Sequence, residues 1–389
     1  MNRWLNRTVL GIGVASLLSD LSHEAVTALL PAMLASMGVA AAALGTIEGV
    51  ADGFSSVAKL YGGWLTDRIR RRKPLCAAGY GAMALATAII AVAGHWLIVL
   101  AGRSLAWLAR GIRTPARKTL LAEAVTPQTY GRAFGFERTM DTLGAVIAPL
   151  AALGLLAWGW HQRSVIWLSV LPALAATLAI LFLVREKENH VQQTHSLATS
   201  LRGLPKNFLK LLRGVGAFGA GDFAHSLMTL YAVTVLTPQY GFAQATTISV
   251  ALYALHNVVY AGISYPAGVW ADRFDKRKLL AAAYFLGVMN AVLLASGISS
   301  LGMLTLAFVL GGTSVGMEET LEDSLAAEML PKESRGSGFG AMATVNGVGD
   351  LISSVAVGWL WATFGVATGF GFAAALMAIG AFMIARKQR

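Results

Sequence analysis

Twelve long apolar runs constrain this chain more than any other feature of its sequence. Each has the length of roughly 18 residues or more that a helix needs to cross a bilayer. They lie at residues 8–34, 42–64, 74–94, 96–118, 132–156, 164–184, 208–236, 244–269, 277–298, 301–324, 337–361 and 364–385. Because 56% of the residues are hydrophobic and only 13% are charged, the chain is too apolar for a soluble domain. The sequence therefore predicts an all-α membrane protein with twelve transmembrane helices.

Basic residues gather in alternate loops between these runs. They occur at 68–73, 117–132, 185–213, 273–278, 332–335 and 386–389. Cytoplasmic loops of membrane proteins carry most of the lysine and arginine, and the loops expected on the other side carry only Arg163. We therefore expect a multi-pass protein of the cell inner membrane with both termini in the cytoplasm. The net charge of +11 then reflects topology and contact with anionic membrane lipid rather than nucleic-acid binding.

The two halves of the chain repeat each other at an offset of 205 positions. At this offset Gly63, Asp67 and Arg68 align with Gly268, Asp272 and Arg273. One register shared by several positions indicates a duplication. We therefore expect two six-helix bundles, at 1–184 and 208–389, joined by a polar cytoplasmic linker at 185–207.

The repeated loops resemble a motif of a known family. The stretches "GGWLTDRIRRRK" and "GVWADRFDKRK" are similar to the loop motif of the major facilitator superfamily, Gly-x-x-x-Asp-Arg-x-Gly-Arg-Arg/Lys, and to its second-half copy. Arg70 and Asp275 stand where the family usually has glycine. In the fifth run, Gly144, Ala148 and Pro149 follow the spacing of the family's antiporter motif, with alanine in place of one glycine.

The resemblance implies a secondary active transporter that works by alternating access, and no enzyme. It implies a small-molecule substrate, protons as the coupling ion, a monomer and no cofactor. Within the family, the chain resembles most the group of proton-coupled drug and small-molecule antiporters. The resemblance also implies that Asp67 caps a neighbouring helix start at the cytoplasmic edge and, with Arg68, Asp272 and Arg273, holds one conformation closed.

Charged and imidazole side chains inside the predicted spans are the candidate binding residues. Each charge at the bilayer centre costs at least roughly 2.5 kcal/mol, so it needs a partner, a cavity or a function. The candidates for proton or substrate binding are Asp20, His23, Glu24, Asp52, Arg103, Arg138, Asp141, Asp222, His225, His256 and Asn257. In the fold that the resemblance implies, the first, fourth, seventh and tenth helices line a central cavity, which would gather Asp20, Arg103 and Asp222. A buried structural ion pair is the alternative for these charges.

A buried carboxylate whose arginine partner moves between conformations can bind a proton on one side of the membrane and release it on the other. These carboxylates therefore favour proton coupling, and the partial antiporter motif of the fifth run favours export of a small molecule by antiport. One alternative is proton symport of a small organic anion, with Arg103, Arg110 and Arg138 as the counter-charge. Another is export of a transition metal or metal chelate held by the Asp and His side chains. The sequence contains no phosphate-binding loop or HExxH motif that would indicate an enzyme.

The offset of 205 positions also pairs bases with acids at the inner ends of the fourth and tenth runs. Arg113 maps onto Glu318, and Arg117 maps onto Glu322. Opposite charges at related positions indicate a conformational gate that forms when the cytoplasmic side closes, and two independently solvated helix ends are the alternative. The predicted gate consists of Arg110, Arg113 and Arg117 against Glu318, Glu319 and Glu322.

Overall fold

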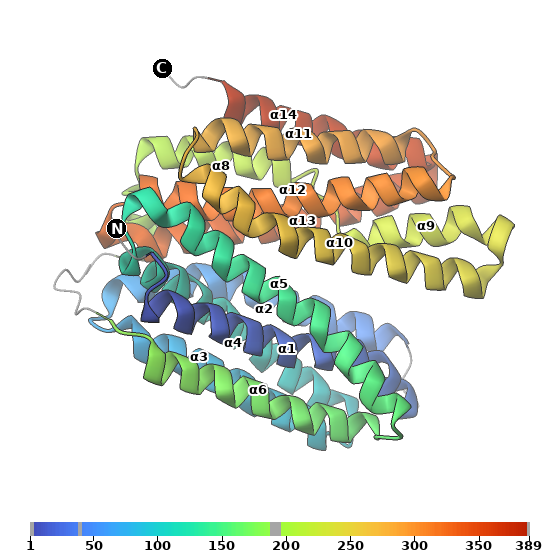
Figure 1. Ribbon diagram of the computed structural model, residues 1–389, viewed down its shortest axis with the longest axis horizontal. Coiled ribbons are helices and arrows are strands. Elements are labelled where there is room, and N and C mark those ends of the chain that lie inside the picture. The colour runs from blue at the N-terminus through green and yellow to red at the C-terminus, as the bar shows by residue number, and fades with distance from the viewer. Residues whose placement is uncertain (1–3, 38–40, 187–195, 387–389) are drawn as a thin grey trace. The chain divides into compact units, whose positions relative to one another are not determined.

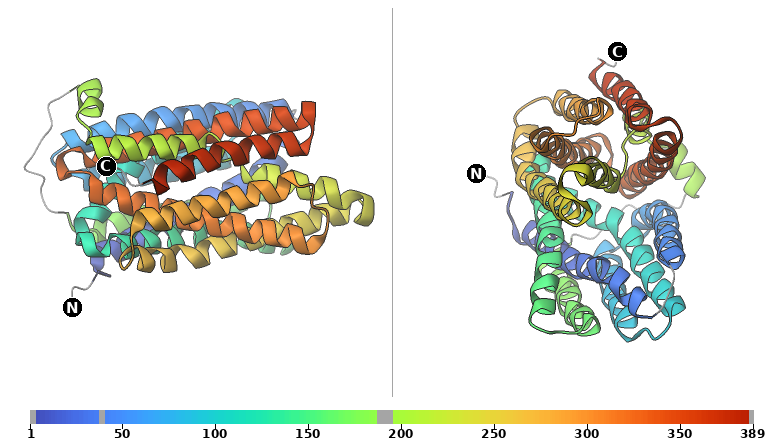
Figure 2. Two further views of the ribbon diagram at one scale, coloured as in Figure 1. Left: turned by 90° about the horizontal axis from the view of Figure 1, so that it is seen from above. Right: turned by 90° about the vertical axis from the view of Figure 1, so that its right-hand side faces the viewer.

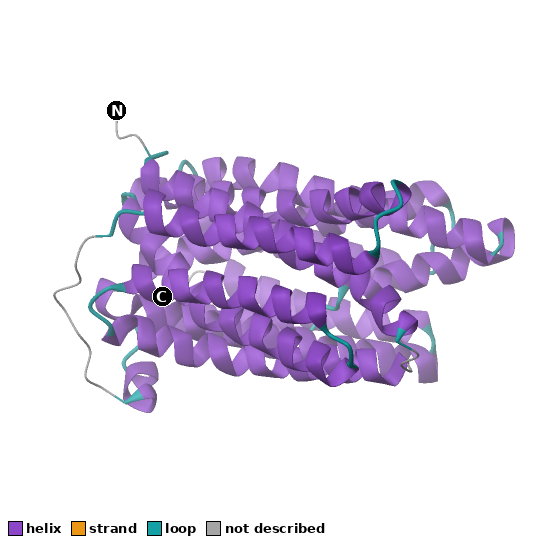
Figure 3. Ribbon diagram, turned by 90° about the horizontal axis from the view of Figure 1, so that it is seen from below, coloured by secondary structure: helices purple, strands orange, loops and turns teal. Residues whose placement is uncertain are grey.

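The computed structural model describes residues 4–37, 41–186 and 196–386, and within these ranges it contains helices and no strand (Figure 3). The long helices of the first half are α1 (Arg7–Ser36), α2 (Ala41–Arg68), α3 (Arg72–Val92), α4 (Trp96–Ala124), α5 (Tyr130–Ala157) and α6 (Gln162–Leu183) (Figure 1). Those of the second half are α8 (Lys206–Gly219), α9 (His225–Tyr240), α10 (Phe242–Ala271), α11 (Lys276–Ala295), α12 (Leu301–Met329), α13 (Arg335–Phe364) and α14 (Val366–Ala385). The short helix α7 (Leu197–Arg202) precedes α8, and the 3-10 turns Pro127–Thr129 and Lys332–Ser334 precede α5 and α13. Each predicted run corresponds to a helix, the run at 208–236 being divided between α8 and α9, so the predicted fold class is confirmed.

Charge content separates the apolar helices from the polar ones. In the described ranges, nine helices are both long and apolar enough to cross a bilayer. The long helix α4 carries more charged residues than any of these nine, and α8 and α9 are each too short alone. The charges of α4 are kept from lipid by packing, since Arg103 and Arg113 are each 2% exposed and Arg117 is 5% exposed. The polar helix α4 is therefore an interior helix of its bundle.

The chain divides into two compact units. Unit 1 comprises Met1–Leu204 and Leu330–Thr344, and unit 2 comprises Pro205–Met329 and Val345–Arg389. The helix α13 therefore contributes its first part to unit 1 and its remainder to unit 2. The domain boundaries predicted from the repeat stay a prediction.

Unit 1 combines an apolar end with a charged middle. The helix α1 packs against α5 and α6, and α4 packs against α2 and α3. Figure 2 shows the helices nearly end-on in its right-hand view. The apolar end includes Val26, Leu29, Leu30, Met33, Ile90, Val99 and Ile166. In the middle of the unit α1 and α5 approach closely at Gly144, where a Cβ atom would lie 2.4 Å from the carbonyl oxygen of Leu17.

Unit 2 contains a helix that is broken within a predicted span. Residues 220–224 between α8 and α9 are not helical, and Asp222 lies in this break. The break packs closely on α14, because a Cβ atom at Gly221 would lie 2.5 Å from the carbonyl oxygen of Ala373. Beside the break, Phe218 of α8 stacks on Tyr284 of α11 with ring centroids 3.7 Å apart. Tight packing therefore fixes the position of the break.

Candidate functional site

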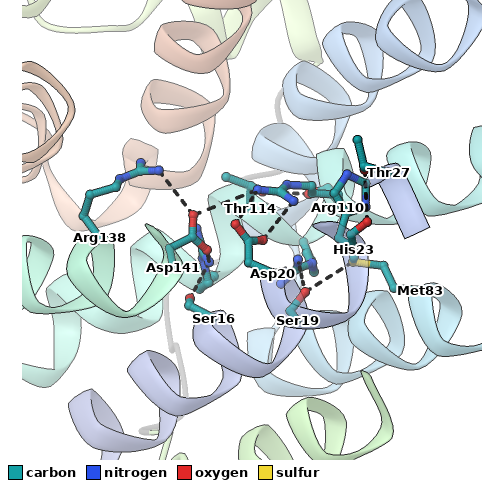
Figure 4. A network of polar contacts seen from close by, with 12 residues as sticks. Ser16, Ser19, Asp20, His23, Thr27, Met83, Arg110, Thr114, Arg138 and Asp141 are labelled. Atoms are coloured by element: carbon teal, nitrogen blue, oxygen red, sulfur yellow. Dashed lines mark hydrogen bonds and ion pairs between the residues drawn. The ribbon is translucent and has the colours of Figure 1, made fainter. Parts of the chain in front are cut away.

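A network of buried charges joins α1, α4 and α5 in the middle of unit 1 (Figure 4). Arg110 of α4 forms an ion pair with Asp20 of α1, with 2.9 Å between Nη1 and Oδ1. Asp141 of α5 accepts contacts from Arg110 at 3.9 Å and from Arg138 at 3.4 Å. The side chains of Arg110 and Arg138 are 22% and 14% exposed, whereas Asp20 and Asp141 are each 7% exposed. The two arginines thus form the accessible part of the network.

Arg117 forms the enclosed part of the same network. Its Nη1 lies 2.7 Å from Oε1 of Glu137 and 3.3 Å from Oδ1 of Asp141. Ser16 of α1 accepts a hydrogen bond from Arg117 and donates one to Glu137 at 2.6 Å. Since Glu137 is 1% exposed, Arg117 neutralises a carboxylate that water does not reach.

Arg113 lies in the same interior but without a carboxylate partner among the described residues. Its Nη2 donates to Oγ of Ser19 at 2.8 Å, and its guanidinium carbon lies 3.7 Å from the ring centroid of Tyr80 on α3. The aromatic face offers the cation a partial negative charge. Arg113 is therefore held between α1 and α3.

An aromatic and imidazole group borders the network toward the apolar end. Trp107 of α4 packs edge-on against His23, with ring centroids 5.0 Å apart. The guanidinium groups of Arg103 and Arg110 each lie 5.7 Å from the Trp107 ring. Arg103 also donates to Oγ1 of Thr27 at 2.9 Å. These contacts join His23 and Arg103 to the predicted site.

Helical spacing explains how these residues meet. Residues three, four and seven apart lie on one face of a helix. Asp20, His23 and Thr27 therefore share one face of α1, and Arg103 and Arg110 share one face of α4. Glu24 follows Asp20 by one turn and is half-buried. The side chain of Asp52 lies outside the described part of the structure.

The predicted residues of unit 2 form a separate group. The rings of His225 and His256 lie 4.4 Å apart, and Nδ1 of His256 lies 3.2 Å from the carbonyl oxygen of Phe308. Asn257 follows His256 on α10 and is half-buried. Among the described residues, no three His, Cys, Asp or Glu side chains come together as a metal site requires. The metal interpretation therefore gains no support from this geometry.

Two of the three acidic residues of the predicted gate, Glu319 and Glu322, have hydrogen-bond partners inside unit 2. Tyr284 donates to Oε1 of Glu322, and Nδ2 of Asn346 donates to its Oε2 at 2.8 Å. Tyr260 donates to Glu319. The arginines of the predicted gate have the partners inside unit 1 that are described above, so the gate stays a prediction.

Asp67 lies at the end of α2, beyond the apolar run, and caps a helix. Its two carboxylate oxygens accept hydrogen bonds from the backbone N–H groups of Gly336 and Ser337, each at 2.7 Å, at the start of α13. Burial raises the pKa of Asp67 to about 6, against the opposing effect of these hydrogen bonds. Arg68 next to it lies over the Trp64 ring at 4.5 Å. A carboxylate at a helix start satisfies free N–H groups and favours the helix dipole.

The motif loop between α10 and α11 makes different capping contacts from the motif loop between α2 and α3. Asp272 ends α10, and Arg273 is exposed. Asp275, which stands where the motif has glycine, caps α11 by accepting from the N–H groups of Arg277 at 2.9 Å and Lys278 at 3.3 Å. The departure from the motif thus has a local structural role.

Sequence reasoning missed the neutral partners of the charged residues. Ser16 lies four positions before Asp20 on α1 and three before Ser19, and this helical spacing was the available signal. Tyr284 and Asn346 gave no such signal, because they belong to helices far from Glu322 in the sequence.

Known proteins resemble the chain over most of its length. The sequence profile described as Major Facilitator Superfamily matches residues 12–259 and 225–388. An MFS-type transporter of Methanocaldococcus jannaschii is 27% identical, over 92% of this chain and 90% of that protein. The 4-hydroxybenzoate transporter PcaK of Pseudomonas putida is 24% identical, over 97% of this chain and 90% of that protein.

Solved structures show the same fold. The human organic anion transporter TETRAN has a TM-score of 0.78 at 16% identity, covering 97% of this chain and 99% of the other. The fucose:proton symporter FucP of E. coli has a TM-score of 0.78 at 14% identity, covering 98% of each chain.

Proposed function

Because the chain belongs to the Major Facilitator Superfamily, we propose that it is a secondary transporter that moves a small organic anion together with a proton. The observation that carries the proposal is the arrangement of Asp20, Arg110, Asp141 and Arg138. Asp141 contacts three arginines within 4 Å, whereas Asp20 has an ion pair with Arg110 alone among the described residues. The network thus has guanidinium donors to share with a further carboxylate.

The coupling follows from competition for Arg110. A substrate carboxylate binds the forked donors of Arg110 and Arg138 in bidentate geometry. Arg110 then leaves Asp20, which remains buried without a counter-charge. Binding a proton is the least costly way for such a carboxylate to become neutral. Anion binding and proton uptake therefore occur together, and release of either one reverses the other.

The substrates named for similar proteins support this substrate class. One relative is a 4-hydroxybenzoate transporter, and one structural neighbour is an organic anion transporter. Both names describe transport of an anion, which suits a site whose accessible groups are arginines. The site and the named substrates thus favour a carboxylate of modest size.

Flux in proteoliposomes tests the proposal. With a pH gradient directed inward, vesicles that hold only this protein should accumulate 4-hydroxybenzoate or benzoate. Arg110→Lys should raise the KM at least about tenfold, because lysine loses the forked donors and a charge-assisted hydrogen bond contributes about 1.5 kcal/mol or more. Asp20→Asn should keep substrate exchange at equal pH but lose accumulation driven by the gradient.

Lys278→Gln serves as the matched control, because this cation is exposed on α11. It should leave both KM and accumulation unchanged. Gradient-driven accumulation by Asp20→Asn at the wild-type level would remove Asp20 from the coupling.

Export of a small molecule in exchange for protons is the second candidate. The close approach of α1 and α5 at Gly144, in a segment with the spacing of the antiporter motif, favours it. In the same vesicles, uphill substrate movement against the direction of proton flow would support export and contradict symport.

A further inference from the structure

Two glutamates one turn apart on α12 differ in the hydrogen bonds that their carboxylates accept. Glu318 and Glu322 are 7% and 1% exposed, so both are removed from water. Both oxygens of Glu322 accept hydrogen bonds, from Tyr284 and Asn346. The Oε2 atom of Glu318 has no hydrogen-bond partner among the described residues. Of two carboxyl groups with similar burial, only Glu322 thus has donors that stabilise an anion.

The broken helix brings another carboxylate to Glu318. Asp222 lies in the break between α8 and α9, and both of these helices contact α12, which carries Glu318. Helix breaks at mid-membrane depth form cation and proton sites in other transporters, because they free backbone carbonyl groups. No salt bridge in the described residues joins Glu318 or Asp222 to a lysine or arginine. The pair therefore has no counter-charge from unit 2.

The surroundings of Glu318 are acidic or weakly polar on each neighbouring helix. The charged and titratable groups around it are Asp222 in the break, Tyr284 of α11, Glu319 and Glu322 of α12, and Asp350 of α13. His225 of α9 and Tyr260 of α10 lie beside the neighbouring Glu319. An ionised Glu318 would add another negative charge to this group in a medium of low dielectric constant. A group of three side chains suited to a metal ion is absent from the described residues.

We infer that Glu318 carries a proton, and that Glu318 and Asp222 form a proton-binding pair at the break between α8 and α9. The proton removes the cost of a buried charge that has no donor. Glu322 stays ionised beside it, because Tyr284 and Asn346 supply donors. The site goes beyond the proposed function, which assigns the coupled proton to Asp20 in unit 1. It gives the protein a second protonatable site that uses different helices.

Infrared spectroscopy of the purified full-length protein in lipid tests the inference without any substrate. A protonated carboxyl group has a carbonyl stretching band that ionised carboxylates lack, and this band shifts in D₂O. All variants carry Asp20→Asn, so that a proton on Asp20 does not contribute. Glu318→Gln should remove one carboxylic-acid equivalent from the band. The matched control Glu322→Gln, one turn away, should keep it.

A conservative variant tests whether a lost band in Glu318→Gln results from misfolding. Glu318→Asp keeps the acid and should shift the band rather than remove it. An unchanged band in Glu318→Gln would overturn the inference, and so would a band that emerges only when sodium is removed, because the pair would then hold a cation. Since no transport is measured, failure here leaves the proposed symport untouched.

Discussion

Arg117 has two buried carboxylates and a serine around one guanidinium group, and Glu137 depends on it for neutralisation. Replacing one member of a buried ion pair leaves the other charge uncompensated, which costs about 3–5 kcal/mol. We expect Arg117→Met to lower the free energy of unfolding by that amount, measured by thermal unfolding in detergent.

Combining Arg117→Met with Glu137→Leu should recover much of the loss, because the second change removes the stranded charge. Lys278→Met, at an exposed position, should leave unfolding unchanged and serves as the control. Wild-type stability of Arg117→Met alone would show that Glu137 is neutral without its arginine.

Spacing within a helix predicts which side chains share a face, but not which residues of other helices they meet. The set on α1 was predicted in this way. The partner of Asp20 is Arg110, about 90 positions along the chain, and sequence spacing carries no information on such a pair. Arg113 was predicted at a gate, and the structure places it against Tyr80 and Ser19. Its direction depends on interhelical packing, which a pattern of charges does not encode.

At the scale of helices, Gly144 sets the separation of α1 and α5. A Cβ atom there would also lie 3.1 Å from Cβ of Asp20, so a larger residue would move the site itself. We expect Gly144→Ala to destabilise the protein by about 1–3 kcal/mol, the usual cost of overpacking, and to reduce transport. Thermal unfolding and flux in vesicles measure the two effects.

Gly154→Ala on the same helix is the matched control. A Cβ atom at Gly154 would meet nothing within 4 Å, and alanine favours a helix by about 1 kcal/mol over glycine. It should therefore be neutral or stabilising. Equal effects of the two substitutions would show that the close approach does not govern α5.

Apolar runs predicted the helices well, because the bilayer demands length and hydrophobicity together. The break between α8 and α9, inside the predicted run at 208–236, was missed for a related reason. The segment "GVGAFGAGDFA" is apolar enough to read as one span, although its glycines at 214, 216, 219 and 221 weaken a helix. Hydropathy measures how apolar a segment is. It does not detect a local loss of helical hydrogen bonds.

At the scale of the whole molecule, Asp67 joins residues far apart in the sequence, and this contact should depend on pH. In the folded protein the pKa of Asp67 is raised from 3.8 to about 6. Between these values the folded protein binds a proton that the unfolded chain does not, so this group makes stability rise as pH falls from 7 toward 4. The free energy of unfolding rises by at most about 3 kcal/mol, because each unit of difference in pKa between the folded and unfolded states contributes about 1.4 kcal/mol.

Comparison with Asp67→Asn isolates this effect, since asparagine does not titrate. As pH falls from 7 to 5, the free energy of unfolding of the wild type should rise relative to that of the variant. Parallel pH profiles of the two proteins would assign the dependence to other groups.

The repeat predicted two halves, and the loop motif predicted a cap by Asp67. Neither indicated that residues 330–344 cluster with the first half. That grouping depends on contacts such as the one between Phe134 and Phe339, whose rings lie 5.8 Å apart. A duplication shows that two segments have similar sequences. It gives no information on which residues of one segment cluster with the other.

The first part of α13 belongs to unit 1. During protein synthesis, unit 1 can therefore be completed only after this part of α13 has been made. Asp67 leaves the ribosome early, but the N–H groups of Gly336 and Ser337 follow only after α12 has been made. Nascent chains generally fold from the amino terminus, domain by domain. Here the amino-terminal bundle has its carboxylate uncapped throughout the insertion of the following helices. The two bundles therefore mature together, and a ribosome that stalls before residue 330 leaves both of them unfinished.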